Sequence, residues 1–155
     1  MTFSLIIANA LAFLYLSALD PAVVGDTLDR WGLLPGRLGL GTAPTLVSAM
    51  FLHASWAHLL GNLLFLWIFG DNVEDRFGHG RYLAFYLGAG VAANIAQALA
   101  TPHSLVPVIG ASGAIAAVMG AYFVLFPQSR VVMLIWLVFY VDFVEIPAVL
   151  FLGFW

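Results

Sequence analysis

The sequence predicts an all-α fold, a polytopic helical bundle embedded in a membrane. Of the 155 residues, 63% are hydrophobic and only 8% are charged, and the mean hydropathy is +1.03. A single water-soluble core cannot hide that much apolar surface, so lipid must be the solvent. The apolar residues also fall into blocks of about the length that crosses a bilayer, and short polar segments separate these blocks.

Composition excludes several classes of function. The formal charge of −3 comes from five basic residues, all arginine, against eight acids, so no basic surface is available for nucleic acid. The chain has no cysteine, which excludes disulfides and thiolate chemistry.

The first apolar block, Phe3–Leu19, is long enough to span a membrane. A cleaved signal peptide is the alternative, but no basic residue precedes the block and no convincing cleavage site follows it. The next segment, Asp20–Pro44, is rich in turn-forming residues and contains Trp31. We expect it to be a long loop at the level of the lipid headgroups.

The second block, Thr45–Gly70, is unusual because it carries His53, His58 and Asn62. Polar groups at membrane depth are costly and need a partner or a function. His58 and Asn62 are four residues apart and therefore lie on one face of a helix. They either bond a neighbouring helix or form part of a site.

A polar segment, Gly70–Arg81, separates the second block from a third span, Tyr82–Ala100. We expect this segment to be a compact turn that a surface pair of Glu74 and Arg76 helps to close. The third span contains many glycines and alanines, which predicts a central helix with close neighbours.

The fourth block, Val108–Phe126, places the hydroxyl of Ser112 among small residues at the start of an uncharged helix. Ala116 and Gly120 follow at intervals of four residues, so this face has a groove that another backbone can approach. A serine in a membrane helix often only bonds back to its own helix, and this stretch alone leaves catalysis open.

Two interpretations fit the end of the chain. One is a single span that starts at Val131, with Asp142 and Glu145 near its middle. We favour the other, in which a fifth helix starts near Glu145, because acids and a proline suit the first turn of a helix. Residues 131–140 then lie along the interface or re-enter the membrane. This interpretation gives four full transmembrane helices plus a partial fifth.

The arginines indicate an orientation. If the loops alternate sides, three arginines share the side of the N-terminus and two lie opposite, which favours a cytoplasmic N-terminus. The two groups are Arg76, Arg81 and Arg130 against Arg30 and Arg37.

Counting along the helices places the polar residues at one depth. His58 lies 12 residues above Gly70, and Ser112 lies 14 above Phe126. At about 1.5 Å per residue these heights are about 18 and 21 Å, in the outer half of the membrane. Such convergence of a serine, a histidine and an asparagine is more typical of a site than of unrelated packing.

These residues suit acyl transfer by a serine nucleophile. Attack by Ser112 on an amide creates a negative oxygen, which His58, Asn62 and the backbone N–H of Ser112 can stabilise. Gly110 and Gly113 would let a substrate backbone come close, so we predict that they bind substrate.

The two motifs together resemble the rhomboid intramembrane serine proteases. The segment Gly110–Gly113 (GASG) opens one helix, and His53–Asn62 (HASWAHLLGN) lies on an earlier one. The resemblance implies that Ser112 is the nucleophile and that His58 and Asn62 form the oxyanion hole.

The resemblance covers nearly the whole chain, so we expect residues 1–155 to form a single rhomboid-like membrane domain. It implies a multi-pass protein, expected in a bacterial cytoplasmic membrane, that cuts transmembrane helices of other proteins near the outer face without metal or cofactor. The family core has six helices.

In this family the general-base histidine lies on the sixth helix, which would follow Trp155. The other histidines, His53, His79 and His103, are poor substitutes for it. Residues 1–155 alone are therefore expected to lack the sixth helix and to cleave nothing.

Two other classes of function stay open. A catalytically inactive rhomboid relative would bind transmembrane clients without cutting them. A transporter would place Asp142 and Glu145 deep in the fifth helix.

Overall fold

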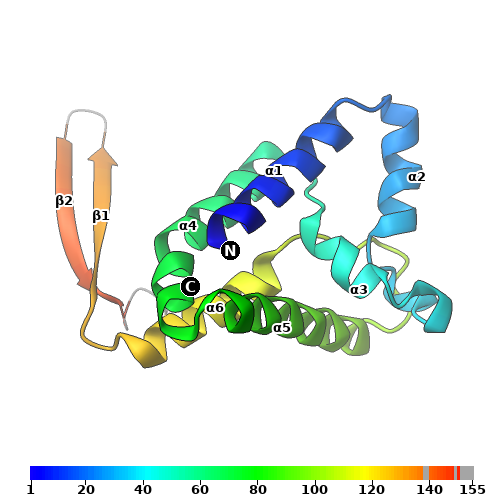
Figure 1. Ribbon diagram of the computed structural model, residues 1–155. Helices are drawn as coiled ribbons and strands as arrows, with labels where there is room; N and C mark the ends of the chain where they lie inside the picture. The colour runs from blue at the N-terminus through cyan, green and yellow to red at the C-terminus, as the bar shows by residue number, and fades with distance from the viewer. Residues whose placement is uncertain (138–139, 149, 151–155) are drawn as a thin grey trace.

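The computed structural model describes residues 1–137, 140–148 and 150. This part of the chain is mostly helical and ends in a two-stranded hairpin (Figure 1). The α-helices are α1 (Thr2–Ser17), α2 (Pro21–Trp31), α3 (Thr45–Ser48), α4 (Trp56–Phe77), α5 (His79–Ala100) and α6 (Ser112–Leu125). Three short 3₁₀ helices are η1 (Pro35–Arg37), η2 (Leu40–Thr42) and η3 (Ala49–Phe51).

Four helices form one bundle with a shared core. In Figure 1, α1 lies beside α4, and α6 packs against both α4 and α5. Each helix contributes buried apolar side chains to the same cluster, such as Leu5 of α1, Leu66 of α4, Tyr86 of α5 and Ile115 of α6. The apolar blocks of the sequence therefore meet in one core, as a helical bundle requires.

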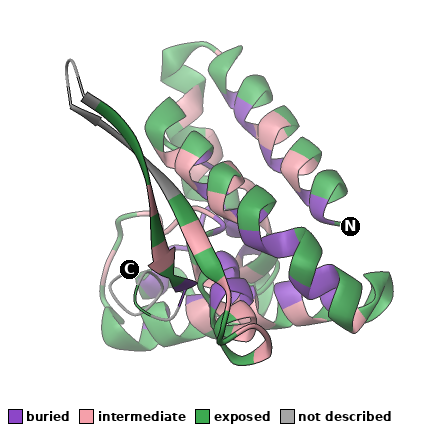
Figure 2. Ribbon diagram, turned by 90° about the vertical axis from the view of Figure 1, so that its left-hand side faces the viewer, coloured by how far each residue is buried: buried purple, intermediate pink, exposed green. Residues whose placement is uncertain are grey.

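The outer faces of the bundle are also apolar. Phe3, Ile7 and Leu11 follow one face of α1 at intervals of four and are 56–63% exposed. Leu60 and Leu64 do the same on α4, with 56% and 48% exposed. Figure 2 shows the exposed positions on the outward sides of these helices and the buried ones between them. Continuous apolar surface of this kind suits contact with lipid better than contact with water.

Helix length alone identifies fewer complete spans than the sequence predicts. Among the described residues, α5 is long and apolar enough to cross a bilayer by itself. The bent pair formed by residues 45–51 and α4 adds a second if it is counted as one span, and α1 and α6 are apolar but shorter. The predicted count of four full spans is therefore not confirmed.

The expected long loop at Asp20–Pro44 contains a helix, so that prediction is wrong over α2. Asp20 caps the helix by accepting a hydrogen bond from the Ala22 N–H at 2.9 Å, and Pro21 occupies the first helical position. Both are standard signals for a helix start. The prediction gave more weight to Gly25 and the acids than to this cap.

The second apolar block is not one continuous helix. The chain breaks after η3 and turns by 96° before α4 begins at Trp56. Ser55 caps α4, because its hydroxyl accepts a hydrogen bond from the His58 N–H at 3.2 Å. His53 therefore lies in the break and not on the helix that carries His58 and Asn62.

The expected turn at Gly70–Arg81 is largely helical as well. Helix α4 continues to Phe77, and α5 starts directly after Gly78, whose φ of 78° is the left-handed conformation that glycine tolerates. Glu74 and Arg76 do not form the expected pair. Arg76 instead lies over the Phe126 ring, 5.3 Å from its centroid.

Glu74 fastens α1 to the end of α4. Its buried carboxylate accepts hydrogen bonds from the Met1 ammonium group at 2.5 Å and from the Thr2 N–H at 2.7 Å, and it also pairs with His79. These partners come from two separate places in the chain, the N-terminus of α1 and the start of α5. A buried carboxylate with several charge-assisted bonds stabilises a fold more than an exposed pair does.

We therefore expect Glu74→Gln to lower the free energy of unfolding by about 1–3 kcal/mol, because the ammonium group and the Thr2 N–H lose a charged acceptor. Unfolding in mixed micelles, followed by circular dichroism, measures this change. The neighbouring Asp75 is exposed, so Asp75→Asn is the matched control. Equal stability of the two variants would contradict the proposed role of Glu74.

The described chain is mostly helical, as the all-α prediction requires, but it also contains a two-stranded hairpin near its end, which that prediction did not include. Strands β1 (Arg130–Leu137) and β2 (Tyr140–Pro147) pair antiparallel, so the described part of the segment that was expected to lie along the interface or re-enter is a strand, and Glu145 itself lies on β2 and not in the first turn of a helix. Glu145 is exposed on β2 and forms an ion pair with Arg130 at 3.2 Å. After the strands, the described residues Ala148 and Leu150 have helical backbone, and the rest of the predicted partial fifth helix lies outside the described residues.

Candidate functional site

The first turns of α4 carry the predicted pair of polar residues. His58 is half-buried in the first turn, and Asn62 follows one turn later with its side chain buried. The chain bends by 96° before Trp56, and Gly110 lies close to the His58 and Asn62 side chains in the first turns of α4. Both side chains therefore face the segment that leads into α6.

Asn62 has a partner that sequence reasoning missed. Its amide nitrogen lies 2.8 Å from Nε2 of His53, which is itself only 2% exposed. An amide nitrogen can only donate, so Nε2 of His53 accepts and the ring proton is on Nδ1. Asn62 keeps a second N–H for another acceptor. His53 thus holds the Asn62 amide, and its ring also meets that of His58 edge to face at 4.9 Å between centroids.

Gly110 brings the start of α6 against this pair. Its φ is 115°, and a Cβ atom at this position would lie 2.6 Å from Nε2 of His58 and 3.7 Å from Nδ2 of Asn62. The Gly110 N–H donates to the Ala49 carbonyl oxygen at 2.9 Å, which fixes the backbone there. Only glycine allows both this conformation and this close approach. Ser112 follows two residues later.

The segment before Ser112 is tied to the region after α2. Leu33 and Val108 exchange two backbone hydrogen bonds of 3.1 and 2.8 Å, and the Gly36 N–H donates to the Ser104 carbonyl oxygen at 2.8 Å. Residues 32–36 thus form a support for residues 104–110. Turn-forming composition alone did not indicate this role.

Ser112 is the first residue of α6 and its side chain is exposed. Ala111 precedes it, and no side chain caps the helix there. The N–H groups of the first turn therefore point out of the helix with the positive end of its dipole behind them. Ala116 and Gly120 are also exposed, and an added Cβ at Gly120 would meet nothing within 4 Å. The predicted small-residue face is open.

Gly113 lies at the contact between α6 and α5. A Cβ atom there would lie 2.5 Å from Cβ of Ala93, so Gly113 lets α6 pack closely on α5. Gly110 packs against His58 in a comparable way. The structure gives both glycines a packing role, and their role in binding substrate stays a prediction.

The remaining histidines lie apart from Ser112 or are already bonded. His79 pairs with Glu74 at the other end of α4, and His103 is exposed in the segment between α5 and α6. No hydrogen bond joins Ser112 to a histidine within the residues that the structure describes. The same residues contain no group of three side chains placed to hold a metal ion.

Several known proteins are similar to this chain. The family model of the Rhomboid domain matches residues 41–155. Rhomboid-like protein 11, chloroplastic, of Arabidopsis thaliana is 42% identical over 107 residues, which are 69% of this chain and 34% of that protein. Rhomboid protease GluP of Bacillus subtilis is 36% identical over 121 residues, 77% of this chain and 23% of that protein. Rhomboid protein 1, mitochondrial, of Saccharomyces cerevisiae is 28% identical over 95 residues, 59% and 28% of the two chains.

The matched part is about a quarter to a third of each of these relatives. The match with the domain covers most of this chain, including the break before α4, residues 104–110 and the start of α6. The relatives come from a bacterium, a chloroplast and a mitochondrion, so the expected bacterial origin gains no support from them. The chain belongs to the rhomboid family of integral membrane proteins.

Proposed function

We propose that this chain carries the catalytic core of an intramembrane serine endopeptidase. Ser112 acts as the nucleophile, and His58 and Asn62 donate hydrogen bonds to the oxyanion. The observation that carries the proposal is the contact of Gly110 with His58 and Asn62, because it sets the uncapped start of α6 beside two side-chain donors. A relative named as a protease, 36% identical over 77% of this chain, supports the same reaction class.

In the proposed reaction, Oγ of Ser112 attacks the carbonyl carbon of the scissile peptide. The carbonyl oxygen becomes negative and receives hydrogen bonds from the His58 ring, the Asn62 amide and the N–H groups at the start of α6. Collapse breaks the C–N bond, the serine proton passes to the leaving amine through a general base, and water then hydrolyses the acyl-enzyme. The resemblance places that base on a later helix.

We propose that the substrate is a transmembrane helix cut near the outer face of the membrane. The exposed face formed by Ser112, Ala116 and Gly120 supports this, because small residues let an extended backbone approach. The length of α6 supports this depth. Its 14 residues are about 21 Å long, which is shorter than a membrane core of about 30 Å, so the helix starts below one surface if it ends at the other. The cytoplasmic N-terminus, the four full spans and the single domain over residues 1–155 are part of the same proposal.

The test is cleavage of a single-span reporter protein in liposomes by the protein expressed from its intact gene. We expect two fragments whose new ends map to the outer part of the reporter helix, without any added metal. Stable binding of an uncut reporter would contradict the proposal and favour the inactive relative that binds transmembrane clients.

We expect Asn62→Ala to lower kcat by about 10²- to 10³-fold and to change KM little, because the lost donor acts on charge that develops in the transition state. Steady-state kinetics with the reporter separate the two constants. Asn72 is exposed on the same helix, so Asn72→Ala is the matched control. An unchanged kcat in Asn62→Ala would show that the hydrogen bond of Asn62 is structural and that Asn62 does not stabilise the oxyanion.

His53 is expected to act as a positioning residue for Asn62. His53→Phe removes the acceptor at 2.8 Å and should lower kcat by about tenfold or more, while His53→Gln, which keeps an acceptor, should recover part of the loss. The double variant with Asn62→Ala should be no slower than Asn62→Ala alone. If the losses of kcat in the two single variants added up in the double variant, His53 would not act through Asn62.

A further inference from the structure

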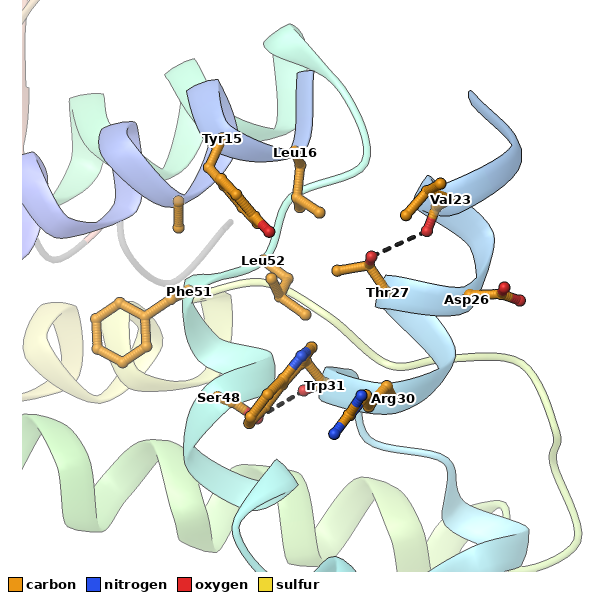
Figure 3. A pocket seen from close by; sticks show the side chains of 11 residues that line it. Tyr15, Leu16, Val23, Asp26, Thr27, Arg30, Trp31, Ser48, Phe51 and Leu52 are labelled. Carbon is orange, nitrogen blue, oxygen red and sulfur yellow. Dashed lines mark hydrogen bonds between the residues drawn. The ribbon is translucent and has the colours of Figure 1, made fainter. Parts of the chain in front are cut away.

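Helix α2 stands at the end of the bundle away from the hairpin, and none of its residues is buried (Figure 1). Val23 and Trp31 are 46% and 48% exposed, although they face the bundle. A hydrogen bond of 2.6 Å from the Ser48 hydroxyl to the Trp31 carbonyl oxygen holds the end of the helix to α3 (Figure 3). The helix is therefore tethered at its end, and a space remains behind it.

That space is a cavity of about 530 Å³ between α1, α2 and η3. Figure 3 shows Tyr15 and Leu16 of α1 pointing across it toward Leu52. Phe51 adds a further apolar wall, and Arg30 lies at the α2 side. The volume falls within the range of about 300–1,000 Å³ that is typical of ligand pockets. The cavity is thus mostly apolar, with one acid, Asp26, and one cation, Arg30, at the α2 edge.

Arg30 also borders a smaller cavity of about 190 Å³. Arg37, Asp29, Thr42 and Thr45 complete the polar part of its lining. The ion pairs recorded for the described residues do not include either arginine or Asp29. The Arg30 guanidinium lies over the Trp31 ring, 5.7 Å from its centroid, which orients it without neutralising its charge. Two cations and one carboxylate therefore face one small space.

We propose that these two cavities bind one phospholipid whose headgroup carries a phosphate and a primary ammonium group. An acyl chain occupies the larger cavity, Arg30 and Arg37 bind the phosphate, and Asp29 accepts hydrogen bonds from the ammonium group. Arginine suits phosphate because its planar fork donates two parallel hydrogen bonds. An anionic headgroup without the ammonium would place no cation against Asp29, and a quaternary ammonium could not donate to it.

Position in the membrane supports this occupant. Family membership makes the chain an integral membrane protein, so phospholipid is present at high concentration around α2. Trp31 and Arg30 are the residue types that lie at the level of the headgroups, with apolar surface on one side and water on the other. The bound lipid would fill the space that keeps α2 away from α1. This inference does not depend on the proposed proteolysis.

The test is native mass spectrometry of the protein released from liposomes with equal amounts of phosphatidylethanolamine, phosphatidylglycerol and phosphatidylcholine of one acyl composition. We expect phosphatidylethanolamine to be retained several-fold more than the other two. Arg30→Gln should lower retention of all three by about tenfold, as expected for one charge-assisted hydrogen bond. Arg81→Gln, at the start of α5, is the matched control and should retain lipid like the parent protein.

Asp29→Asn tests the contact with the ammonium group separately from the contacts with the phosphate. It leaves the phosphate contacts in place, so overall retention should persist while the preference for phosphatidylethanolamine over phosphatidylcholine disappears. Arg37→Gln removes the other proposed phosphate ligand and should lower retention in the same way as Arg30→Gln. Unchanged helix content by circular dichroism shows that each variant is folded. Retention that is unchanged in both arginine variants, a preference for phosphatidylglycerol, or no retained lipid would overturn the proposal.

Discussion

Replacing Ser112 by alanine is expected to lower the rate of reporter cleavage by at least about 10⁴-fold, because the nucleophile of the proposed acyl transfer is lost. The structure of the rest of the site should be unchanged. Ser112 is exposed and no hydrogen bond from its side chain is recorded, so its removal leaves the packing of α6 on α4 and α5 unchanged. The variant should therefore unfold at the same temperature as the parent protein and still bind the reporter.

Ser4 is the control for this result, because it is an exposed serine on α1. Ser4→Ala should cleave at the rate of the parent protein. A Ser112→Ala protein that is folded and still cleaves above a few per cent of the parent rate would require another nucleophile.

Gly110→Ala is expected to disrupt both the fold and the site. A Cβ atom at this position would lie 2.6 Å from Nε2 and 2.7 Å from Cε1 of His58, and the residue would also keep a φ of 115°. The strained backbone costs about 1–3 kcal/mol and the overpacking a similar amount, so we expect the free energy of unfolding to fall by about 2–6 kcal/mol.

His58 must move to relieve this clash, which would displace it from the start of α6. A displacement of about 1 Å can lower a rate by about 10²-fold, so the folded fraction of Gly110→Ala should cleave at least that much more slowly. Gly88→Ala is the control, because an added Cβ there meets nothing within 4 Å. Parent-like stability and cleavage in Gly110→Ala would show that the contact between Gly110 and His58 is not required.

Helical periodicity and depth predict that Ser112 lies near His58 and Asn62, and the structure tests part of this prediction. His58 and Asn62 share a face because they are four residues apart, and counting along two apolar helices placed Ser112 at their level. The structure brings Gly110, two residues before Ser112, against both side chains. Their chemical roles stay predictions. Periodicity works here because a helix converts sequence distance into position without reference to its neighbours.

Features that depend on local caps or on tertiary contacts were missed. The break before Trp56 lies within an apolar run, and Ser55 is its main local signal. That bend brings His53 to Asn62, so the position of His53 could not be inferred from a continuous helix. Glu74 is buried because its donors come from Met1 and Thr2, more than 70 residues away in the sequence.

The hairpin was missed for a different reason. Hydropathy reports the solvent that a segment prefers and not its hydrogen-bonding pattern, so the apolar run after Arg130 fits a strand as well as a helix. Acids followed by a proline are also typical of a helix start, which favoured a helix near Glu145. In the structure Glu145 instead pairs with Arg130 across the two strands.

The most direct measurement is the position of the adduct after the membrane-embedded protein, expressed from its intact gene, reacts with a fluorophosphonate probe. This probe phosphonylates serines that are activated as nucleophiles. Peptide mass spectrometry should find the adduct on Ser112 in the parent protein, none in Ser112→Ala, and slower labelling in Asn62→Ala because an oxyanion donor is lost. An adduct on another serine, or equal labelling of Ser112→Ala, would contradict the assignment of Ser112 as the nucleophile beside His58 and Asn62.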